Sequence, residues 1–185
     1  HGWLNFNGEK MSKSRGNVVD PYLLSERFGV DALRFFLLRT FPFGSDGNFT
    51  NELLMSTINI DLANTLGNLV SRTVAMNQKY FAGSLAQGGE SAALDEELKA
   101  LALDVIAKYE QQMEKFQFSL ALNGVFRLLD RANKYIDETT PWVLAKSEDT
   151  KVRLLTVMKS LCECIRIAAI LITPMMPESS EKILN

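Results

Sequence analysis

Most of the chain, from Thr50 onward, shows the periodicity of amphipathic helices. Apolar residues recur there at intervals of three or four, which places them on one face of an α-helix. The spacing predicts four long helices, over residues 50–80, 95–116, 118–140 and 150–172, and a short helix after Pro177. Because most of the links between these helices are short, we expect an antiparallel bundle.

The first 49 residues have a loop-rich pattern. Asp20, followed by proline, is typical of a helix start, because aspartate caps the first turn and proline fits the first helical position. Gly29 is expected to end that helix. Asp31 is expected to cap a second helix that runs to about Arg39. Turn residues follow, with one brief strand at residues 48–49.

These patterns predict a mainly all-α protein in two parts. Residues 1–49 form a small connector of loops and helices, and residues 50–185 form the helical bundle. The chain opens with His1 rather than methionine, and its last residues look like a helix cut short. We therefore expect it to be a piece of a longer protein. A glycine-containing linker is expected at residues 83–89.

The composition narrows the class of protein. The chain has 185 residues, of which 46% are apolar and 23% charged, which is typical of a globular domain. Its formal net charge of −2 excludes a surface that grips nucleic acid by overall charge, so any such contact needs a local patch. No apolar run is long enough to cross a membrane, and no signal peptide opens the chain. We expect a cytoplasmic protein with no membrane partner.

The cysteines and the histidine do not predict a metal site. Cys162 and Cys164 lie two positions apart in a helical stretch, so their side chains point in different directions. Two cysteines with a single histidine cannot complete a structural zinc site. We expect reduced core thiols.

Residues 8–17 hold the highest density of side chains suited to ligand binding. Lys10, Ser12, Lys13 and Ser14 lie close together, with a glycine on each side. Ammonium groups, hydroxyls and free backbone amides are the donors that bind phosphate oxygens. The alternative is a solvated basic turn without function.

A second set of polar residues recurs on the first long helix. Asn64, Asn68 and Arg72 are four positions apart and share a face away from the apolar stripe. Amide and guanidinium groups can read the edges of unpaired bases. Trp142, after a proline, could stack on an unpaired base. The alternatives are an ordinary solvent-facing stripe and a tryptophan packed in the core.

The order Lys-Met-Ser-Lys-Ser at residues 10–14, with its downstream segments 15–21 and 28–36, resembles the signature loop of class I aminoacyl-tRNA synthetases. The resemblance implies that the loop binds ATP phosphates, with Lys13 and Lys10 as catalytic residues and Ser12 and Ser14 as further ligands. That site also needs a motif with two histidines. This chain has only one histidine and no alternation of strands and helices. We therefore expect it to be inactive in amino-acid activation by itself.

Segments 59–73 and 137–146 narrow the resemblance to methionyl-tRNA synthetases. The resemblance implies that Asn68, Arg72 and Trp142 contact the CAU anticodon of tRNA(Met), and Asn64 lies on the same stripe. The parent would join methionine to this tRNA through an adenylate made from ATP with Mg²⁺. Another class I synthetase, a stand-alone RNA-binding module and a bundle that docks proteins are the alternatives.

Overall fold

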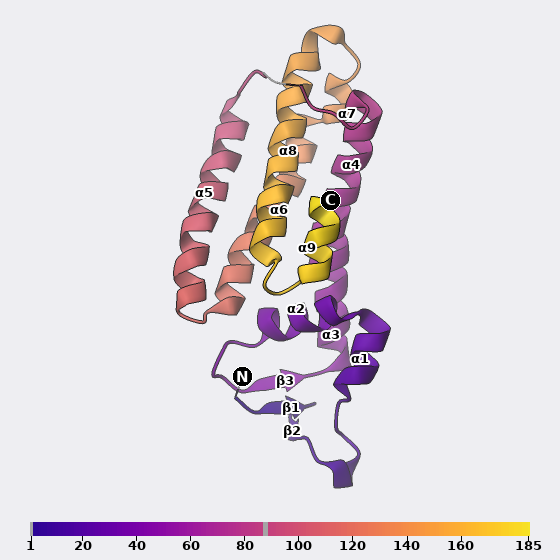
Figure 1. The fold of residues 1–185 in the computed structure, drawn as a ribbon, viewed down its shortest axis with the longest axis vertical. Coiled ribbons are helices and arrows are strands. Elements are labelled where there is room, and N and C mark those ends of the chain that lie inside the picture. Colours follow the sequence, from indigo (N-terminus) through magenta and orange to yellow (C-terminus); the bar gives the residue numbers. More distant parts are fainter. Residues whose placement is uncertain (1, 87–88) are drawn as a thin grey trace.

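The computed structural model describes residues 2–86 and 89–185 and shows a small sheet-containing unit below a helical bundle (Figure 1). His1 and residues 87–88 of the expected linker lie outside the described part. Helices dominate the described chain, which confirms the mainly all-α prediction. The long helices run alternately up and down, as an antiparallel bundle requires.

Three short strands form the sheet of the N-terminal unit. They are β1 (Leu4–Phe6), β2 (Glu9–Lys10) and β3 (Gly47–Phe49), in the order β2-β1-β3. β1 and β2 form an antiparallel hairpin, and its turn residues Asn7 and Gly8 both have positive φ, as a tight two-residue turn requires. β3 pairs in parallel with β1 and confirms the expected brief strand, whereas the sequence analysis did not include the hairpin.

Two helices connect the sheet to the bundle, α1 (Pro21–Phe28) and α2 (Val30–Thr40). Asp20 caps α1 as predicted, because its carboxylate accepts the backbone N–H of Tyr22. The predicted role of Asp31 is wrong. It lies inside the first turn of α2, and its Oδ2 accepts the backbone N–H of Ser179, at 2.6 Å. A contact with a helix distant in sequence thus replaces the local cap.

One continuous helical rod leads from the connector into the bundle. It consists of α3 (Asn51–Thr57), the π-helix η2 (Ile58–Gly67) and α4 (Asn68–Phe81). Thr50 caps its start by accepting the N–H of Leu53. The expectation of a uniform α-helix is therefore wrong over ten residues. In η2 the hydrogen bonds span five residues instead of four, and the Asn68 N–H accordingly bonds to the Ala63 carbonyl.

Contacts from outside the rod hold the π-helical stretch. The side-chain amide of Asn133 donates to the Thr65 carbonyl at 3.1 Å. Arg39 of α2 forms an ion pair with Asp61 at 3.0 Å, and both side chains are largely buried. The wide turns of η2 are thus anchored both to the bundle and to the connector.

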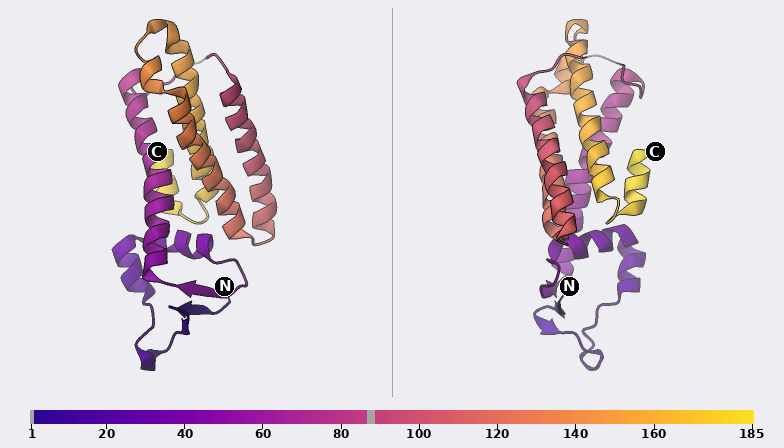
Figure 2. Two further views of the ribbon diagram at one scale, coloured as in Figure 1. Left: turned by 180° about the vertical axis from the view of Figure 1, so that it is seen from behind. Right: turned by 60° about the vertical axis from the view of Figure 1, so that its left-hand side comes forward.

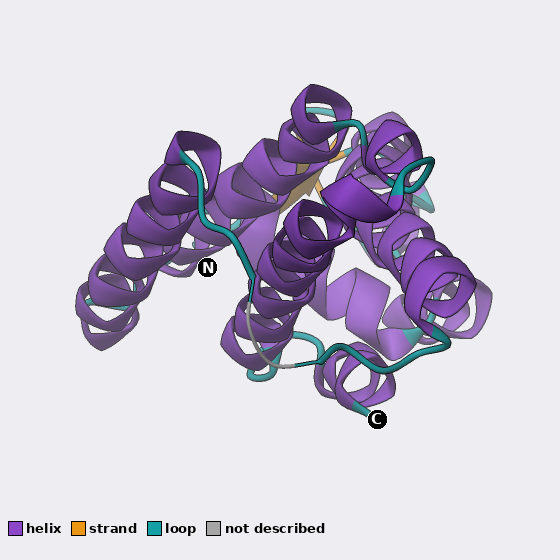
Figure 3. Cartoon of the chain, turned by 90° about the horizontal axis from the view of Figure 1, so that it is seen from above, coloured by secondary structure: helices purple, strands orange, loops and turns teal. Residues whose placement is uncertain are grey.

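The remaining helices complete the bundle. They are α5 (Ala93–Glu114), α6 (Phe118–Thr139), α7 (Pro141–Leu144), the 3₁₀ turn η3 (Glu148–Thr150), α8 (Lys151–Ile172) and α9 (Pro177–Leu184). The predicted long helices are confirmed, and α6 ends just before Pro141, as expected. Seen from above, the short helix α9 lies at the edge of the bundle (Figure 3).

Two hydrophobic cores meet at α2. Phe35 belongs to the bundle core and lies 5.0 Å, between ring centroids, from Phe126 of α6. The next residue, Phe36, belongs to a smaller core with Phe41, Phe49 and Leu54. Because neighbouring residues on a helix point in different directions, α2 packs against both parts of the molecule.

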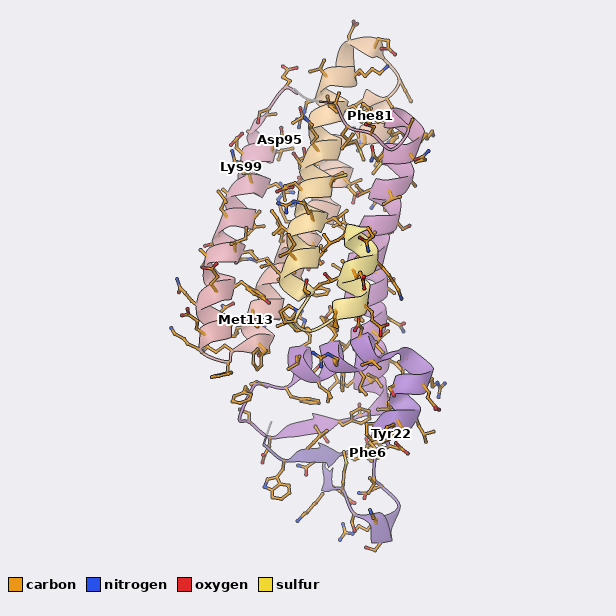
Figure 4. All side chains as sticks on the ribbon, viewed as in Figure 1. Phe6, Tyr22, Phe81, Asp95, Lys99 and Met113 are labelled. Carbon is orange, nitrogen blue, oxygen red and sulfur yellow. The ribbon has the colours of Figure 1, made fainter. Side chains whose placement is uncertain are left out.

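A buried polar cluster ties three bundle helices together at their upper end. Asp95 lies on the side of α5 that faces α8 (Figure 4). Its carboxylate accepts hydrogen bonds from Arg153 of α8 and from the Tyr135 hydroxyl of α6. Burial alone would raise the pKa of Asp95, but the hydrogen bonds from Arg153, Tyr135 and the Ala92 N–H outweigh it and lower the pKa.

Both cysteines are free thiols on α8. Cys164 is buried, which confirms its expected place in the core, and this burial raises its pKa to about 12. Cys162 is half-buried, and burial raises its pKa as well.

Candidate functional site

The loop with the predicted phosphate ligands projects from the lower end of the molecule (Figures 1 and 2). Lys10 ends strand β2, and the 3₁₀ turn η1 (Lys13–Arg15) follows, with Ser12 at its cap position. On either side of the turn, Met11 and Val19 pack against the smaller hydrophobic core. The sheet unit thus anchors both ends of the loop and leaves the turn in solvent.

The predicted phosphate ligands are accessible. Lys10, Lys13 and Ser14 are exposed, and Ser12 is half-buried. The hydroxyls of Ser12 and Ser14 are 2.8 Å apart. Within residues 2–86 and 89–185, the Lys13 ammonium has neither an ion-pair partner nor a hydrogen-bond acceptor. The side chain of Lys10 lies over the Trp3 ring, with Nζ 5.1 Å from its centroid. The loop therefore presents donors that an anion can engage.

The predicted polar stripe lies on the rod, but its geometry is not uniform. Asn64 is inside η2 and Asn68 opens α4, and both are exposed. The apolar residues Leu66 and Leu69 are buried in the bundle core. The stripe is thus solvent-facing at both asparagines, although the α-helical spacing assumed between residues 64 and 68 does not apply in a π-helix.

Arg72 differs from the expected exposed ridge. One of its guanidinium nitrogens lies 3.1 Å from Oδ1 of Asp137, and its side chain is one-third exposed. Asp137 belongs to the last turn of α6, so the ion pair joins α4 to α6. The Asp137 carboxylate is two-thirds exposed, so this ion pair lies at the surface.

Trp142 is a surface residue. Its side chain belongs to neither hydrophobic core, and 44% of the residue is exposed. Thr140, in the left-handed region with φ of 43°, and the buried Pro141 turn the chain sharply between α6 and α7. This turn presents the tryptophan outside the bundle and excludes the alternative of a fully buried core residue.

The stripe and the tryptophan occur at neighbouring helices. Figures 1 and 2 show α7 beside the upper part of α4. Lys79 and Tyr80 of α4 share a hollow of about 220 Å³ with Leu144 at the end of α7. Asp137, the ion-pair partner of Arg72, lies five residues before Trp142 in sequence. Residues 72 and 142 are therefore brought to adjacent elements, about 70 positions apart in the chain.

Three further residues, not predicted as site residues, contact the stripe, the π-helix or the phosphate loop: Asp137, Asn133 and Asn17. Asp137 pairs with Arg72, Asn133 supports η2, and Asn17 bonds to the backbone of the phosphate loop. The first two depend on how α6 is set against the rod, which no local pattern reveals. Asn17 could have been suspected, because asparagine commonly bonds to nearby backbone in turns.

Within the described ranges, no group of three or more His, Cys, Asp or Glu side chains could hold a metal ion. In the same ranges, no helix is long and apolar enough to cross a membrane.

Two family comparisons cover most of the chain. Residues 1–74 match the family described as tRNA synthetases class I (M), and residues 85–185 match the anticodon binding domain of methionyl tRNA ligase. The chain belongs to the methionyl-tRNA synthetase family. The match excludes the alternative that the signature loop belongs to another class I synthetase.

Individual members of the methionyl-tRNA synthetase family agree with this assignment. The methionine–tRNA ligases of Clostridium tetani and Caldanaerobacter subterraneus are both 55% identical to this chain, over 99% and 98% of its length. The chain spans only 28% of the length of either relative. The Mycobacterium tuberculosis methionyl-tRNA synthetase in complex with methionyl-adenylate superimposes with a TM-score of 0.95 at 46% identity, covering all of this chain and 36% of that one.

Proposed function

We propose that this chain is the part of a methionine–tRNA ligase that carries its ATP loop and reads the anticodon of tRNA(Met). Residues 1–49 would be the end of the catalytic region, and residues 50–185 the anticodon-binding bundle. The observation that carries the proposal is the exposed indole of Trp142, on a helix beside the one that bears Arg72. The family match of residues 85–185 to an anticodon binding domain supports it.

The anticodon reader combines stacking with hydrogen bonding. Trp142 offers a flat apolar face to an unstacked base, and such contacts contribute about 1–3 kcal/mol per base. Arg72, Asn68 and Asn64 offer donors and acceptors suited to base edges. The Arg72 guanidinium also pairs with Asp137 and so joins α4 to α6.

The ATP loop fits a polyphosphate by the chemistry of its donors. Lys13 supplies an ammonium that is unpaired among the described residues, and Lys10, Ser12 and Ser14 supply a second cation and two hydroxyls. In the parent protein these groups would bind the phosphates of ATP and stabilise the negative charge that builds up during adenylate formation. ATP would act there together with Mg²⁺, and we assign no metal ligand to this chain.

We expect the isolated chain to bind tRNA but not to activate methionine. It has a single histidine, whereas the nucleotide-binding half of such an enzyme needs a motif with two, and its described residues form a three-stranded sheet instead of a doubly wound one. A full catalytic cycle would require the rest of the parent.

Binding of the isolated chain to tRNA tests the anticodon reader. At a fixed salt concentration, the chain should bind tRNA with a CAU anticodon more tightly than the same tRNA with a changed anticodon. Trp142→Ala should weaken cognate binding roughly tenfold or more, from the lost stacking, whereas Trp142→Phe should retain most of it. Val143→Ala, at an exposed neighbour on α7, serves as the matched control.

Two outcomes of the tRNA-binding experiment would contradict the proposal. If the Trp142→Ala chain remains folded by circular dichroism and binds both tRNAs as the unaltered chain does, the indole does not read the anticodon. If the unaltered chain binds all tRNAs equally, a general RNA-binding module describes it better.

A further inference from the structure

The side chain of Asn17 closes the base of the phosphate loop. Its Oδ1 accepts the backbone N–H of Ser12 at 2.7 Å, and its Nδ2 donates to the backbone carbonyl of Lys10 at 3.3 Å. One amide thus bridges the two backbone positions that flank Met11, from the opposite side of the loop. The hydrogen bond to Ser12 is partly buried, so water competes less for it, whereas the bond to Lys10 is exposed to solvent.

Inside this base, the turn holds itself together through its own backbone. The N–H of Arg15 bonds to the Ser12 carbonyl, and the N–H of Gly16 bonds to the Lys13 carbonyl. Gly16 has φ of 67°, a conformation that glycine adopts without strain and that reverses the chain toward Asn17. Residues 12–16 therefore form a compact turn that carries the hydroxyls of Ser12 and Ser14 and the ammonium of Lys13.

Few other contacts fasten this turn to the molecule. Besides the bonds of Asn17, the described residues provide one ion pair, in which Arg15 lies 3.6 Å from Glu9. Both of its side chains are two-thirds exposed, and ion pairs at such sites contribute little. Met11 and Val19 hold the two ends of the loop by apolar packing, and Asn17 provides the main polar contacts that orient the turn between them.

We propose that Asn17 is a positioning residue for ATP, an inference that rests on the proposed function of the loop. It fixes residues 12–14 in the arrangement that meets the phosphates, although it touches no phosphate itself. Without it, the turn would be ordered only when ATP binds, and that ordering would reduce affinity and misplace Lys13 in the transition state.

The first experiment uses the full-length parent protein and measures methionine-dependent pyrophosphate exchange. Asn17→Ala removes both hydrogen bonds and should lower kcat/KM for ATP roughly tenfold, in line with two lost bonds of ordinary strength. The KM for methionine and the Kd for tRNA should not change. Asn17→Asp keeps an acceptor for Ser12 but loses the donor to Lys10, so it should also be impaired.

Two further variants serve as a control and as a test of the loop itself. Asn51→Ala changes an exposed asparagine at the start of α3 and should leave ATP use unaltered. Lys13→Ala tests the loop itself, and we expect adenylate formation to slow on the order of a hundredfold. If Lys13→Ala has no effect, the proposed function of the loop fails. If Lys13→Ala slows the reaction but Asn17→Ala does not, only the positioning role fails.

The second experiment reports on the turn without any activity. In this chain, trypsin can cut the turn after Lys13 and Arg15. Asn17→Ala should increase the rate of cleavage at these two bonds severalfold, while the melting temperature stays the same. Unchanged cleavage rates would overturn the inference, because the turn would then be held by something other than Asn17.

Discussion

Asp95→Ala should remove a large part of the stability of the bundle. The side chain of Asp95 is 6% exposed. Its carboxylate accepts hydrogen bonds from both terminal nitrogens of Arg153, at 2.5 and 2.9 Å. It also accepts the Tyr135 hydroxyl and the backbone N–H of Ala92, the latter at 2.7 Å. The alanine variant leaves a largely buried cation and a buried hydroxyl without their acceptor.

The expected loss in free energy of unfolding is about 3–5 kcal/mol, the usual effect of breaking a buried ion pair by removing one partner. The side chain of Arg153 is 19% exposed, so water can solvate part of the stranded guanidinium, and we place the loss nearer to 3 kcal/mol. Domains of this kind have a total stability of about 5–15 kcal/mol. The variant should therefore still fold, but with a clearly lower urea midpoint.

Equilibrium urea unfolding followed by circular dichroism at pH 7 measures this loss. The slope of the transition should not change, since the exposed area on unfolding is nearly the same. Asp104→Ala is the control, because Asp104 lies on the same helix and pairs with Lys108 and Arg127 at the surface. Its effect should be far smaller. A loss below about 1 kcal/mol for Asp95→Ala would refute the reasoning about buried pairs.

The contribution of Asp95 should also depend on pH in a defined direction. Its pKa in the folded chain is below the value in the unfolded chain, which is about 3.9. The stabilisation is therefore fully present above that unfolded value and is lost as the pH falls through the folded pKa. The stability difference between the unaltered chain and Asp95→Ala should accordingly narrow below about pH 4.

Two further predictions concern Arg72 and the thiols. Arg72→Ala should reduce the preference for the CAU anticodon roughly tenfold, the effect of one lost base contact; equal weakening for every tRNA, with a shallower salt dependence, would instead indicate a phosphate contact. Iodoacetamide at pH 8 should leave Cys164 unmodified in the folded Cys162→Ser chain, because burial raises the pKa of Cys164 to about 12. In urea the same thiol should react fully, and rapid labelling without denaturant would contradict the buried position.

The sequence could predict the bundle because its helices are long and strongly amphipathic. The stretches that became α5, α6 and α8 each repeat their apolar positions over many turns, and proline or a capping residue marks most of their ends. The hairpin β1–β2 is different. Asn7 followed by Gly8 is a recognised turn signal, but strands of two or three residues carry too little alternation to confirm it.

The π-helix η2 could not be predicted from spacing. Apolar residues four positions apart suit both an α-helix and the wider π-helix, so the local pattern does not distinguish them. The π-helical stretch has contacts from elsewhere in the chain, namely the bond from Asn133 to Thr65 and the ion pair of Arg39 with Asp61, which no local pattern reveals. Asp31 shows the same effect. The local pattern predicts that its carboxylate caps α2, but the carboxylate accepts the backbone N–H of Ser179 instead.

The sequence could predict which residues are candidates for the site, but not the contacts that these residues make. An exposed position for Asn64 and Asn68 follows from the apolar stripe, because polar residues opposite such a stripe face solvent. The ion pair that holds Arg72 does not follow, since Asp137 lies 65 positions away. Sequence patterns specify which side of one helix is polar, whereas the partner of a side chain depends on how two helices are set against each other.

Helix α2 sets the sheet unit against the bundle through apolar packing and through hydrogen bonds. Phe35 and Phe36 are both fully buried but belong to different hydrophobic cores. Arg34 donates to the carbonyls of Pro174 and Met175 after α8, and Asp31 accepts from α9. A rotation of the sheet unit relative to the bundle would break these polar contacts and open both cores together. Packing and hydrogen bonds at α2 therefore hold the sheet unit and the bundle in one relative orientation.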